Sequence, residues 1–375
     1  MPDAPPAVLQ VLPALVSGGV ERGTVEIAQA IAGAGLRSLV ASAGGPLAAE
    51  VEAVGGRHLT LPLDRKSPAA LLSNAAALRR IVRAEGVRIL HARSRFPAWS
   101  ALMAARATGA SFVTTYHGTY NEGFPGKRLY NSVMARGDRV IAISEHIAEV
   151  VRTRHGVGPD RLRVIPRGVD PVRFDPDTVA PDRIEALRRA WSLPPGRPVI
   201  LLPARLTRWK GQGVLLRAVA GWPEPRPVVV LAGDAQGRDA YVAELRAEAG
   251  DLGVDVRLPG PVSDMAAAFL AADLVIHAST EAEAFGRTVI EAQAMGRPVI
   301  ASDLGGPRET VEEGVTGWRV PPGDDRALAG AIARALAMPP DVRHAMDAAT
   351  RAAVLARYTT RAMQDGTLAV YRELL

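Results

Sequence analysis

The sequence predicts an α/β fold made of two domains, each with a parallel β-sheet between helices. Three observations support this prediction. The chain has 375 residues, 48% hydrophobic and 22% charged, so it is long enough for two cores and has the composition of a folded protein. Short apolar runs bounded by Gly or Pro alternate with longer segments of helical period, which is typical of repeated βα units. This alternation occurs in two series that look like two copies of one architecture.

The first series predicts five strands, with helices between them that cover both faces of the sheet. These strands are expected at residues 8–12, 38–41, 87–92, 111–115 and 139–143. The second series begins after a Pro-rich stretch and predicts five more strands. They are expected at residues 199–203, 228–232, 254–258, 274–277 and 298–301.

The segment between the two series predicts an interdomain connector. Residues 168–198 contain a turn-like Gly-Val-Asp-Pro and further prolines. A short helix is expected within this segment, at residues 182–191. The connector therefore joins two domains of similar size.

The C-terminal region is predicted to be helical. Pro339 and Pro340 divide it into pieces, and a last helix with no strand after it is expected at residues 359–375. We expect a first domain of residues 1–178, completed by residues 359–375, and a second domain of residues 179–358.

Composition and charge exclude several classes of function. The chain has no cysteine, which rules out structural disulfides, thiolate catalysis and cysteine-ligated zinc. A net charge of +6 attracts phosphates, nucleotides or an anionic membrane, but aromatic residues are only 5% and the basic residues are dispersed, so no nucleic-acid partner is expected. The N-terminus lacks the features of a signal peptide and the apolar runs are short. A cytoplasmic protein is expected, with membrane contact that is at most peripheral.

Two glycines follow the first predicted strand, in the segment Ser17-Gly18-Gly19-Val20-Glu21. Ligands of parallel α/β sheets bind outside the carboxyl ends of the strands. Glycines let the backbone approach a ligand, and free N–H groups at a helix N-terminus bind anions. The segment is not the Gly-x-Gly-x-x-Gly dinucleotide fingerprint, and the chain contains no P-loop motif. A tight turn without a ligand explains these glycines as well as a phosphate or sugar contact does.

Two cations, Arg205 and Lys210, lie in the loop that follows the strand predicted at 199–203. An arginine fork and a lysine point charge five residues apart can converge on one diphosphate. Isolated basic residues are usually solvated, but the position at the carboxyl end of a strand favours a binding role.

Two carboxylates, Glu283 and Glu291, follow the strand predicted at 274–277. Glu283 is expected in a loop and Glu291 in a helix that begins near Gly286, so both could face a ligand at the helix N-terminus. The backbone amides of residues 285–288 would then be free donors. The alternative is that Glu283 only caps the helix and Glu291 is solvated, but this does not explain the Phe-Gly pair between them.

One further strand end carries a candidate residue. Tyr116-His117-Gly118-Thr119 ends the strand predicted at 111–115. A lone histidine is more often structural, but a histidine followed by glycine in such a loop is a site candidate.

These motifs together resemble the family-4 retaining glycosyltransferases of the GT-B fold. That fold has two Rossmann-like domains with a cleft between them and a C-terminal helix that crosses back to the N-terminal domain. The resemblance covers essentially the whole chain. It rests on Glu283-x7-Glu291, on Arg205 and Lys210 upstream, and on Gly18-Gly19 near the N-terminus.

The resemblance implies a role for each candidate residue. The first domain would bind the acceptor, and the second would bind a nucleotide sugar. Arg205 and Lys210 would bind the donor diphosphate, Glu291 the ribose hydroxyls, and both Glu283 and His117 the transferred sugar. The implied catalytic residues are His117, Arg205, Lys210 and Glu283. The implied donor-binding residues are Gly18, Gly19, Val262, Ala284, Phe285, Gly286, Arg287, Thr288 and Glu291.

The implied activity is the transfer of a hexose-type sugar, with retention, from a nucleotide diphosphate sugar to a hydroxyl of a glycan or glycolipid. No metal and no cofactor are expected, so Arg205, Lys210 and helix dipoles would stabilise the leaving diphosphate. One alternative is a nucleotide-sugar epimerase on the same fold, and another is a non-catalytic nucleotide-sugar binder. A glycoside hydrolase that uses Glu283 and Glu291 is a weaker alternative, because the sequence gives no carboxylate separation.

The donor base and the acceptor are left open by the sequence. A UDP- or GDP-linked sugar is expected as donor. Segments 93–99 and 115–121 resemble bacterial family members that build lipopolysaccharide core. Lys127, Arg128 and Arg136 would meet an anionic lipid or sugar acid, although a solvated basic face explains them equally well. These features favour a glycan or lipid-linked acceptor in lipopolysaccharide or cell-envelope polysaccharide synthesis, and a peripheral place on the anionic inner membrane.

Overall fold

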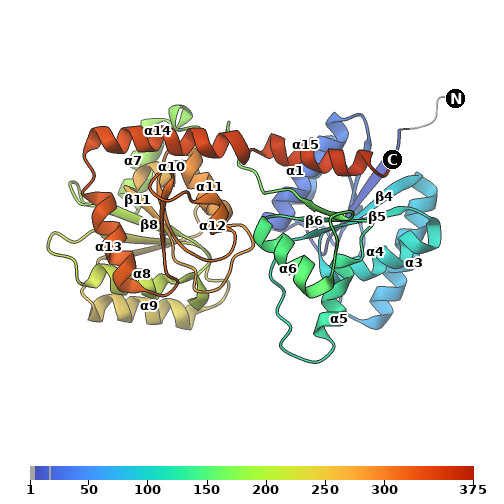
Figure 1. Ribbon diagram of the computed structural model, residues 1–375, viewed down its shortest axis with the longest axis horizontal. Coiled ribbons are helices and arrows are strands. Elements are labelled where there is room, and N and C mark those ends of the chain that lie inside the picture. The colour runs from blue at the N-terminus through green and yellow to red at the C-terminus, as the bar shows by residue number, and fades with distance from the viewer. Residues whose placement is uncertain (1–4, 17) are drawn as a thin grey trace. The chain divides into compact units, whose positions relative to one another are not determined.

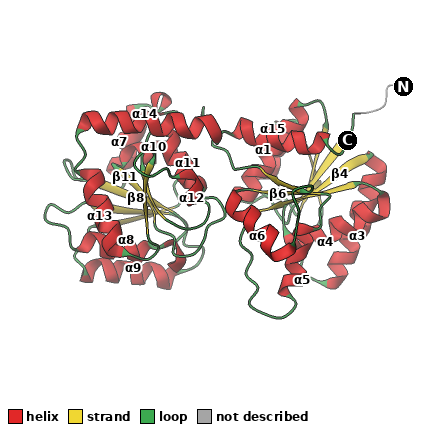
Figure 2. Cartoon of the chain, in the orientation of Figure 1, coloured by secondary structure: helices red, strands yellow, loops and turns green. Residues whose placement is uncertain are grey.

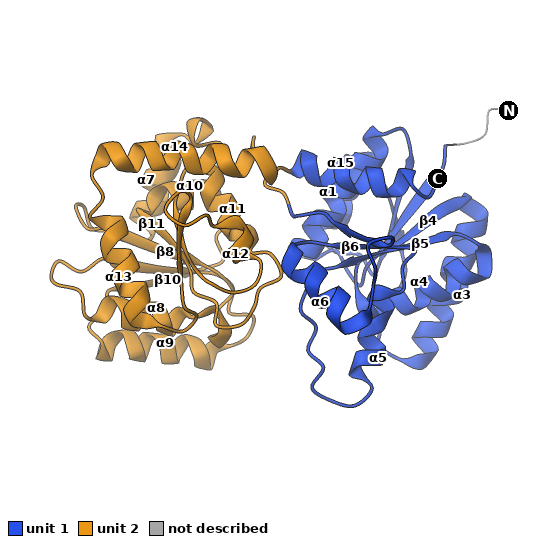
Figure 3. Ribbon diagram, viewed as in Figure 1, with its two compact units in different colours: residues 1–167, 360–375 blue, residues 168–359 orange. Residues whose placement is uncertain are grey.

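The structure is a computed structural model of the chain and describes residues 5–16 and 18–375. It divides into two compact units, shown in different colours in Figure 3. The first unit contains residues 1–167 and 360–375, and the second contains residues 168–359. Each unit has one parallel sheet with helices packed around it (Figure 1). The predicted α/β fold with two parallel sheets is therefore confirmed.

The first unit is built on a seven-stranded sheet with the order β3-β2-β1-β4-β5-β6-β7. All its strand pairs are parallel. Its strands are β1 (Ala7–Val11), β2 (Arg37–Ser42), β3 (Arg57–Thr60), β4 (Val87–Ala92), β5 (Ser111–Tyr116), β6 (Arg139–Ala142) and β7 (Leu162–Val164). The strand order reverses between β1 and β4, which is where ligands bind in sheets of this kind.

The helices of the first unit connect these strands and cover both faces of the sheet (Figure 2). They are α1 (Gly19–Gly33), α2 (Leu47–Ala53), α3 (Pro68–Glu85), α4 (Arg95–Thr108), α5 (Lys127–Asn131), the 3-10 helix η1 (Ser132–Ala135), α6 (Glu145–His155) and α15 (Thr360–Arg372).

The C-terminal helix α15 belongs to the core of the first unit. Met363 and Tyr371 of α15 are buried in one cluster with Val8 of β1 and Ile89 of β4. The Tyr371 hydroxyl lies 2.6 Å from Nδ1 of the buried His91. The prediction that a C-terminal helix crosses back to the N-terminal domain is therefore confirmed.

The second unit is built on a six-stranded parallel sheet with the order β10-β9-β8-β11-β12-β13. Its strands are β8 (Val199–Pro203), β9 (Val228–Ala232), β10 (Val256–Gly260), β11 (Leu274–His277), β12 (Val299–Ser302) and β13 (Gly317–Val320). Its helices are η2 (Pro176–Thr178), α7 (Pro181–Ala190), η3 (Arg208–Lys210), α8 (Gln212–Ala220), α9 (Asp239–Asp251), α10 (Met265–Ala271), α11 (Arg287–Ala294), α12 (Pro307–Thr310), α13 (Asp325–Leu336) and α14 (Pro340–Arg357).

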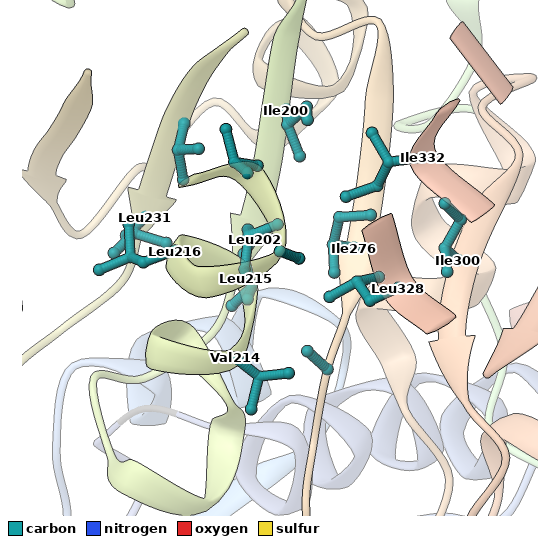
Figure 4. Packing of buried hydrophobic residues seen from close by; sticks show 14 of the residues in the cluster. Ile200, Leu202, Val214, Leu215, Leu216, Leu231, Ile276, Ile300, Leu328 and Ile332 are labelled. Carbon is teal, nitrogen blue, oxygen red and sulfur yellow. The ribbon is translucent and has the colours of Figure 1, made fainter. Parts of the chain in front are cut away.

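The core of the second unit holds β8 and β11 side by side. Leu202 of β8 and Ile276 of β11 pack against Leu215 of α8 and against Leu328 and Ile332 of α13 (Figure 4). All five side chains are fully buried. The strand order reverses between β8 and β11, which pair directly. The loops that follow these two strands are therefore neighbours, at the position where such sheets bind ligands.

Three strands were not expected from the sequence. β3, with the sequence Arg-His-Leu-Thr, lies at a sheet edge and is only partly buried. β7 has three residues, and β13 has the sequence Gly-Trp-Arg-Val. Each of the three lies at the edge of its sheet, so none has the continuous apolar run that identifies a buried parallel strand.

The two units separate at residue 168, whereas the sequence suggested a domain boundary after residue 178. The segment that follows residue 168 packs on the second unit. The amide of Val169 donates to the carbonyl of Tyr358 at 2.8 Å, and Arg351 donates to the carbonyl of Phe174 at 2.9 Å. These long-range contacts assign the start of the expected connector to the second unit.

Candidate functional site

Three side chains meet beyond the carboxyl ends of β8 and β11. Lys210 forms an ion pair with Glu283, and Glu283 is hydrogen-bonded through its other carboxylate oxygen to Nε2 of His277. Lys210 comes from the loop after β8, while His277 is the last residue of β11. The structure therefore brings Lys210 and Glu283 together.

The Lys210–Glu283 pair is largely removed from water. The side chains of Lys210 and Glu283 are 11% and 14% exposed, and that of His277 is 6% exposed. Burial, together with Arg205, lowers the pKa of Lys210, while the Glu283 carboxylate acts in the opposite direction. The pair can be stable in such surroundings because each charge is matched, and removing one member leaves the other uncompensated.

His277 is a neutral hydrogen-bond donor to Glu283. Burial, followed by the nearby Lys210 ammonium, lowers the pKa of His277 to about 3. A carboxylate only accepts hydrogen bonds, so the proton of the neutral ring must be on Nε2. Glu283 is thereby fixed from two sides.

The loop of Lys210 is held against the loop that follows β11. Gly211 has a φ of +74°, and a Cβ atom there would collide with the carbonyl of Ala278. The amide of Thr280 donates to the carbonyl of Trp209 at 2.7 Å. The Lys210 ammonium lies 4.4 Å from the centre of the Trp209 ring. Backbone contacts therefore set the position of Lys210 before any ligand binds.

The segment of Glu283 rests on a second pair of glycines, Gly305 and Gly306. The amide of Gly306 donates to the Glu283 carbonyl at 2.8 Å. A Cβ atom on Gly305 would collide with the Glu283 backbone, and one on Gly306 would collide with the backbone of Phe285. The Phe285 ring is buried and packs edge-on against Tyr358, with ring centres 5.7 Å apart. Phe285 can therefore face a ligand only through its backbone.

Helix α11 begins directly after this segment, as the sequence predicted. Its N-cap residue, Gly286, provides no side-chain hydrogen bond to the helix. The first N–H groups of an α-helix have no partner within the helix, and they lie at its positive end. Glu291 is inside α11 and forms a salt bridge with Arg287, with Oε1 and Nε 3.5 Å apart. Glu291 is therefore not simply a solvated residue.

Arg205 lies at the start of the same loop as Lys210 and is exposed. Its Nη1 donates to Oε1 of Gln236 at 3.4 Å, across to the loop that follows β9. Its carbonyl accepts a hydrogen bond from the buried Gln212 at 3.0 Å. The backbone of Arg205 is thus held in place, while its exposed guanidinium can contact an anion.

The remaining candidates of the second unit surround these groups without forming a cluster of side chains. Ala284 precedes Phe285 in the segment that leads into α11, and Thr288 is the second residue of that helix. Val262 follows β10 and is half-buried. The part of the chain that the structure describes contains no group of three or more His, Cys, Asp or Glu side chains that could hold a metal ion.

The candidates of the first unit form a separate group. Nη2 of Arg167 donates to the carbonyl of Gly19 at 3.1 Å and to Nδ1 of His117 at 2.9 Å. Gly18 is the N-cap residue of α1 and contributes no side-chain cap, while Ser17 lies outside the described residues. The structure therefore connects Gly19 with His117 through Arg167.

The geometry of the second unit suits a diphosphate with a polyhydroxylated group attached. Two cations, Arg205 and Lys210, can neutralise two negative charges, and the start of α11 offers backbone donors. The Glu283 carboxylate can accept hydrogen bonds from hydroxyl groups. When an anion binds the Lys210 ammonium in place of Glu283, the hydrogen bond from His277 still holds Glu283 in position.

Sequence reasoning missed His277, Gly305 and Gly306. His277 is the last residue of a predicted strand. Because ligands bind outside the carboxyl ends of parallel strands, that position could have identified it as a site residue. The two glycines are adjacent in the loop after β12, but their contact with Glu283 joins positions that only the tertiary fold brings together. The bond from Arg167 to His117 was also not expected from the sequence.

Two family models match successive parts of the chain. Residues 17–173 match the family model described as Glycosyltransferase Family 4, and residues 183–353 match the one described as Glycosyl transferases group 1. A solved glycosyltransferase from Rickettsia africae ESF-5 is 34% identical and has a TM-score of 0.91, covering 99% of this chain and 98% of that one. The Anabaena protein Alr3699/HepE, solved in complex with UDP-glucose, is 25% identical with a TM-score of 0.86, covering 98% of this chain and 100% of that one.

The curated relatives are longer than the region they share with this chain. The D-inositol 3-phosphate glycosyltransferase of Acidothermus cellulolyticus is 30% identical over 270 residues, which are 67% of this chain and 57% of that protein. Two further proteins of the same name, from Xylanimonas cellulosilytica and Saccharomonospora viridis, are covered over 50% and 57% of their length. The chain thus spans about half the length of these relatives.

Proposed function

The chain belongs to the family-4 glycosyltransferases, which have the GT-B fold, and on that premise we propose that it transfers a hexose from a nucleotide diphosphate sugar to a hydroxyl group, with retention of configuration. The observation that carries this proposal is the buried arrangement of Lys210, Glu283 and His277 beside Arg205. It places cations next to a fixed carboxylate, and both are needed to bind a nucleotide sugar.

Lys210 and Arg205 neutralise the leaving diphosphate in this proposal. The ammonium and the guanidinium stabilise the charge that develops as the bond to the sugar breaks, and the N-terminus of α11 adds backbone donors. Lys210 then exchanges part of its ion pair with Glu283 for the phosphate. Because the site is already formed, little of the binding energy is lost in ordering it.

Glu283 binds the transferred sugar, and Glu291 binds the ribose. Glu283 accepts hydrogen bonds from sugar hydroxyls while His277 holds it in position. Glu291, which is kept in place by Arg287, accepts hydrogen bonds from the ribose hydroxyls. Val262, Ala284, Phe285, Gly286 and Thr288 contribute backbone contacts to the donor. For the first unit, we propose His117, Gly18 and Gly19 as further residues that bind the donor.

The proposed donor is a UDP-hexose. The structural likeness to Alr3699/HepE, whose solved complexes contain UDP and UDP-glucose, supports uridine over guanosine.

The proposed acceptor is a glycan or glycolipid of lipopolysaccharide or other cell-envelope polysaccharide synthesis. The similarity to glycosyltransferases named for D-inositol 3-phosphate supports an acceptor that carries negative charge. Over the described residues, no helix is long and apolar enough to cross a membrane. We place the enzyme in the cytoplasm, in peripheral contact with an anionic inner membrane.

A thermal-shift titration with UDP, GDP and ADP tests the donor proposal. A bound nucleotide raises the unfolding midpoint by mass action, and we expect the largest rise with UDP. The matched variants are Lys210→Ala, which should abolish the rise, and Arg208→Ala, which should keep it. Arg208 lies in the same loop, but its side chain is 70% exposed and pairs with Glu244. An equal rise of the unfolding midpoint in the unsubstituted protein and in both variants would contradict the assignment of Lys210 to the donor site.

Incubation with UDP-glucose then separates the enzyme classes. A transferase converts the donor to UDP when a suitable acceptor is added, and at most hydrolyses it slowly without one. An epimerase on the same fold would build up an isomeric nucleotide sugar with no acceptor present. A non-catalytic binder would show the thermal shift but no turnover with any acceptor.

A further inference from the structure

An apolar groove on the first unit has no part in the donor site. It encloses about 430 Å³ and lies between the start of α3, the start of α4 and helix α5. This volume is within the range of ordinary small-ligand sites. Leu71 and Leu72 of α3 form one wall, Phe96 and Trp99 of α4 another, and Tyr130 of α5 a third.

The groove offers an occupant apolar surface and almost no hydrogen bonds. The indole N–H of Trp99 donates to the Tyr130 carbonyl at 3.1 Å, and the Ser67 hydroxyl caps α3 by accepting from the Ala70 amide at 3.1 Å. The polar groups of Trp99 and Ser67 are therefore already hydrogen-bonded within the protein. Leu72 is 59% exposed, which is unusual for a leucine next to three aromatic side chains. A suitable occupant is a hydrocarbon chain.

Two basic side chains lie at the groove, and a third lies on the helix that carries Tyr130. Lys66 lies in the wall of the groove, the Arg136 guanidinium lies 5.1 Å from the Trp99 ring centre, and Lys127 opens helix α5. Among the residues that the structure describes, Lys66, Lys127 and Arg136 form no salt bridge with a carboxylate. These charges match an occupant with a negatively charged head group next to its hydrocarbon chain.

The groove is joined to the strand end that carries His117. The Arg95 guanidinium lies 4.2 Å from the ring centre of Tyr120 and 5.6 Å from that of Tyr130, which lines the groove. The amide of Tyr120 donates to the carbonyl of Gly118, next to His117. A stack of aromatic and guanidinium groups therefore leads from the groove to the carboxyl end of β5.

We propose that this groove binds the hydrocarbon chain of a lipid-linked, anionic acceptor. The phosphate or carboxylate of that acceptor contacts Lys66, Lys127 and Arg136, and its sugar hydroxyl extends toward His117. The inference rests on the proposed function and narrows its acceptor to a lipid. Two further apolar side chains, Phe124 just before α5 and Leu129 within it, are 60% and 63% exposed.

The test measures the binding of alkyl phosphates below their micelle concentrations. Butyl phosphate and dodecyl phosphate carry the same head group, and each buried methylene strengthens binding about fourfold. We expect dodecyl phosphate to bind at least tenfold more tightly than butyl phosphate, and Leu72→Glu to remove that difference. Leu72→Trp, which fills the groove without adding charge, should do the same. Val342→Glu, an exposed apolar position in the second unit, is the matched control and should keep the difference.

Three results would overturn the proposal. One is equal binding of the two alkyl phosphates to the unsubstituted protein. Another is a chain-length preference that survives in both Leu72 variants. The third comes from binding to vesicles. Binding to vesicles of phosphatidylglycerol and phosphatidylcholine is therefore measured as well. If the protein bound these vesicles but had no affinity for dodecyl phosphate, surface charge alone would explain its membrane binding, and the groove proposal would be refuted. The UDP-induced thermal shift should be unchanged in Leu72→Glu, so failure of the groove is distinguishable from failure of the donor site.

Discussion

Arg167 donates a hydrogen bond from Nη2 to Nδ1 of His117, at 2.9 Å. An arginine is always protonated, so Nδ1 must be the acceptor, and the proton of the neutral imidazole is on Nε2. Burial is the first cause that lowers the pKa of His117 well below its ordinary value, and Arg167, Arg93 and His91 lower it further. His117 is therefore a neutral ring that presents an N–H donor. Helix α15 supports this arrangement, because Met363 contacts the same guanidinium.

We expect Arg167→Gln to move the acid limb of the pH profile of kcat/KM to higher pH. The neutral form of His117 donates from Nε2, so activity is lost as the pH falls through the pKa of His117. Removing the Arg167 charge raises that pKa, and the loss begins at a higher pH. A bond to a charged group contributes about 1.5–3 kcal/mol, so kcat should also fall about tenfold or more.

Arg163→Gln is the control for this experiment. Arg163 lies in β7, shortly before Arg167 in the chain, but pairs with Glu373 at the surface. Its replacement should leave the acid limb in place. An unshifted limb in Arg167→Gln would show that Arg167 only supports packing.

Lys210→Ala and Glu283→Ala should each reduce turnover about 100- to 1000-fold, as the loss of one preorganised stabilising group does in other enzymes. The measurement is steady-state transfer from UDP-hexose, with circular dichroism to verify the fold. Arg208→Ala, in the same loop, should stay within about twofold, since a solvated ion pair contributes little. Near-normal turnover in both site variants would refute the assignment.

The sequence predicted that Lys210 and Glu283 are site residues, but it did not predict the contacts that hold them in place. The spacing of Arg205 and Lys210, and that of Glu283 and Glu291, is local and visible in a single chain. The contact of Glu283 with Gly306 depends on which strands become neighbours in the sheet, and its contact with His277 depends on how the loop after β11 folds back. Of the thirteen strands in the described residues, ten could be predicted because they are apolar runs, whereas β3, β7 and β13 are edge strands with polar or short sequences. The sequence therefore lacked the contacts that the tertiary fold creates and the strands that have no apolar run.

The Lys210–Glu283 pair should show strong coupling in stability. Either Lys210→Met or Glu283→Gln leaves a buried polar group without its partner, which costs about 3 kcal/mol. The double variant removes both, so its loss should be clearly smaller than the sum of the two single losses. The measurement is the urea midpoint of each variant at constant m. Additive losses would mean that the two side chains are solvated independently.

The affinity for UDP should fall as the pH rises. The form of Lys210 that binds the diphosphate is the ammonium, and burial with Arg205 lowers its pKa from 10.5 toward about 7 while Glu283 opposes that shift. The charge is lost as the pH passes the pKa of the empty site, so affinity should decline within the window from about 7 to 10.5. Titration calorimetry at several pH values measures this decline. Lys210→Arg should flatten it, because a guanidinium stays charged.

Gly305→Ala should weaken donor binding more than it weakens the fold. Gly305 has a φ of +68°, and a Cβ atom there would collide with the backbone of Glu283. Gly314 has a φ of +75° with open space around it, so Gly314→Ala carries the same backbone strain without the collision. Both variants should lose about 1 kcal/mol of stability from the left-handed backbone, but only Gly305→Ala should displace Glu283. We therefore expect a loss of UDP-hexose affinity of about tenfold or more in Gly305→Ala, since misplacing a group by an ångström is costly. Equal affinities in the two variants would mean that the loop of Glu283 does not depend on this glycine.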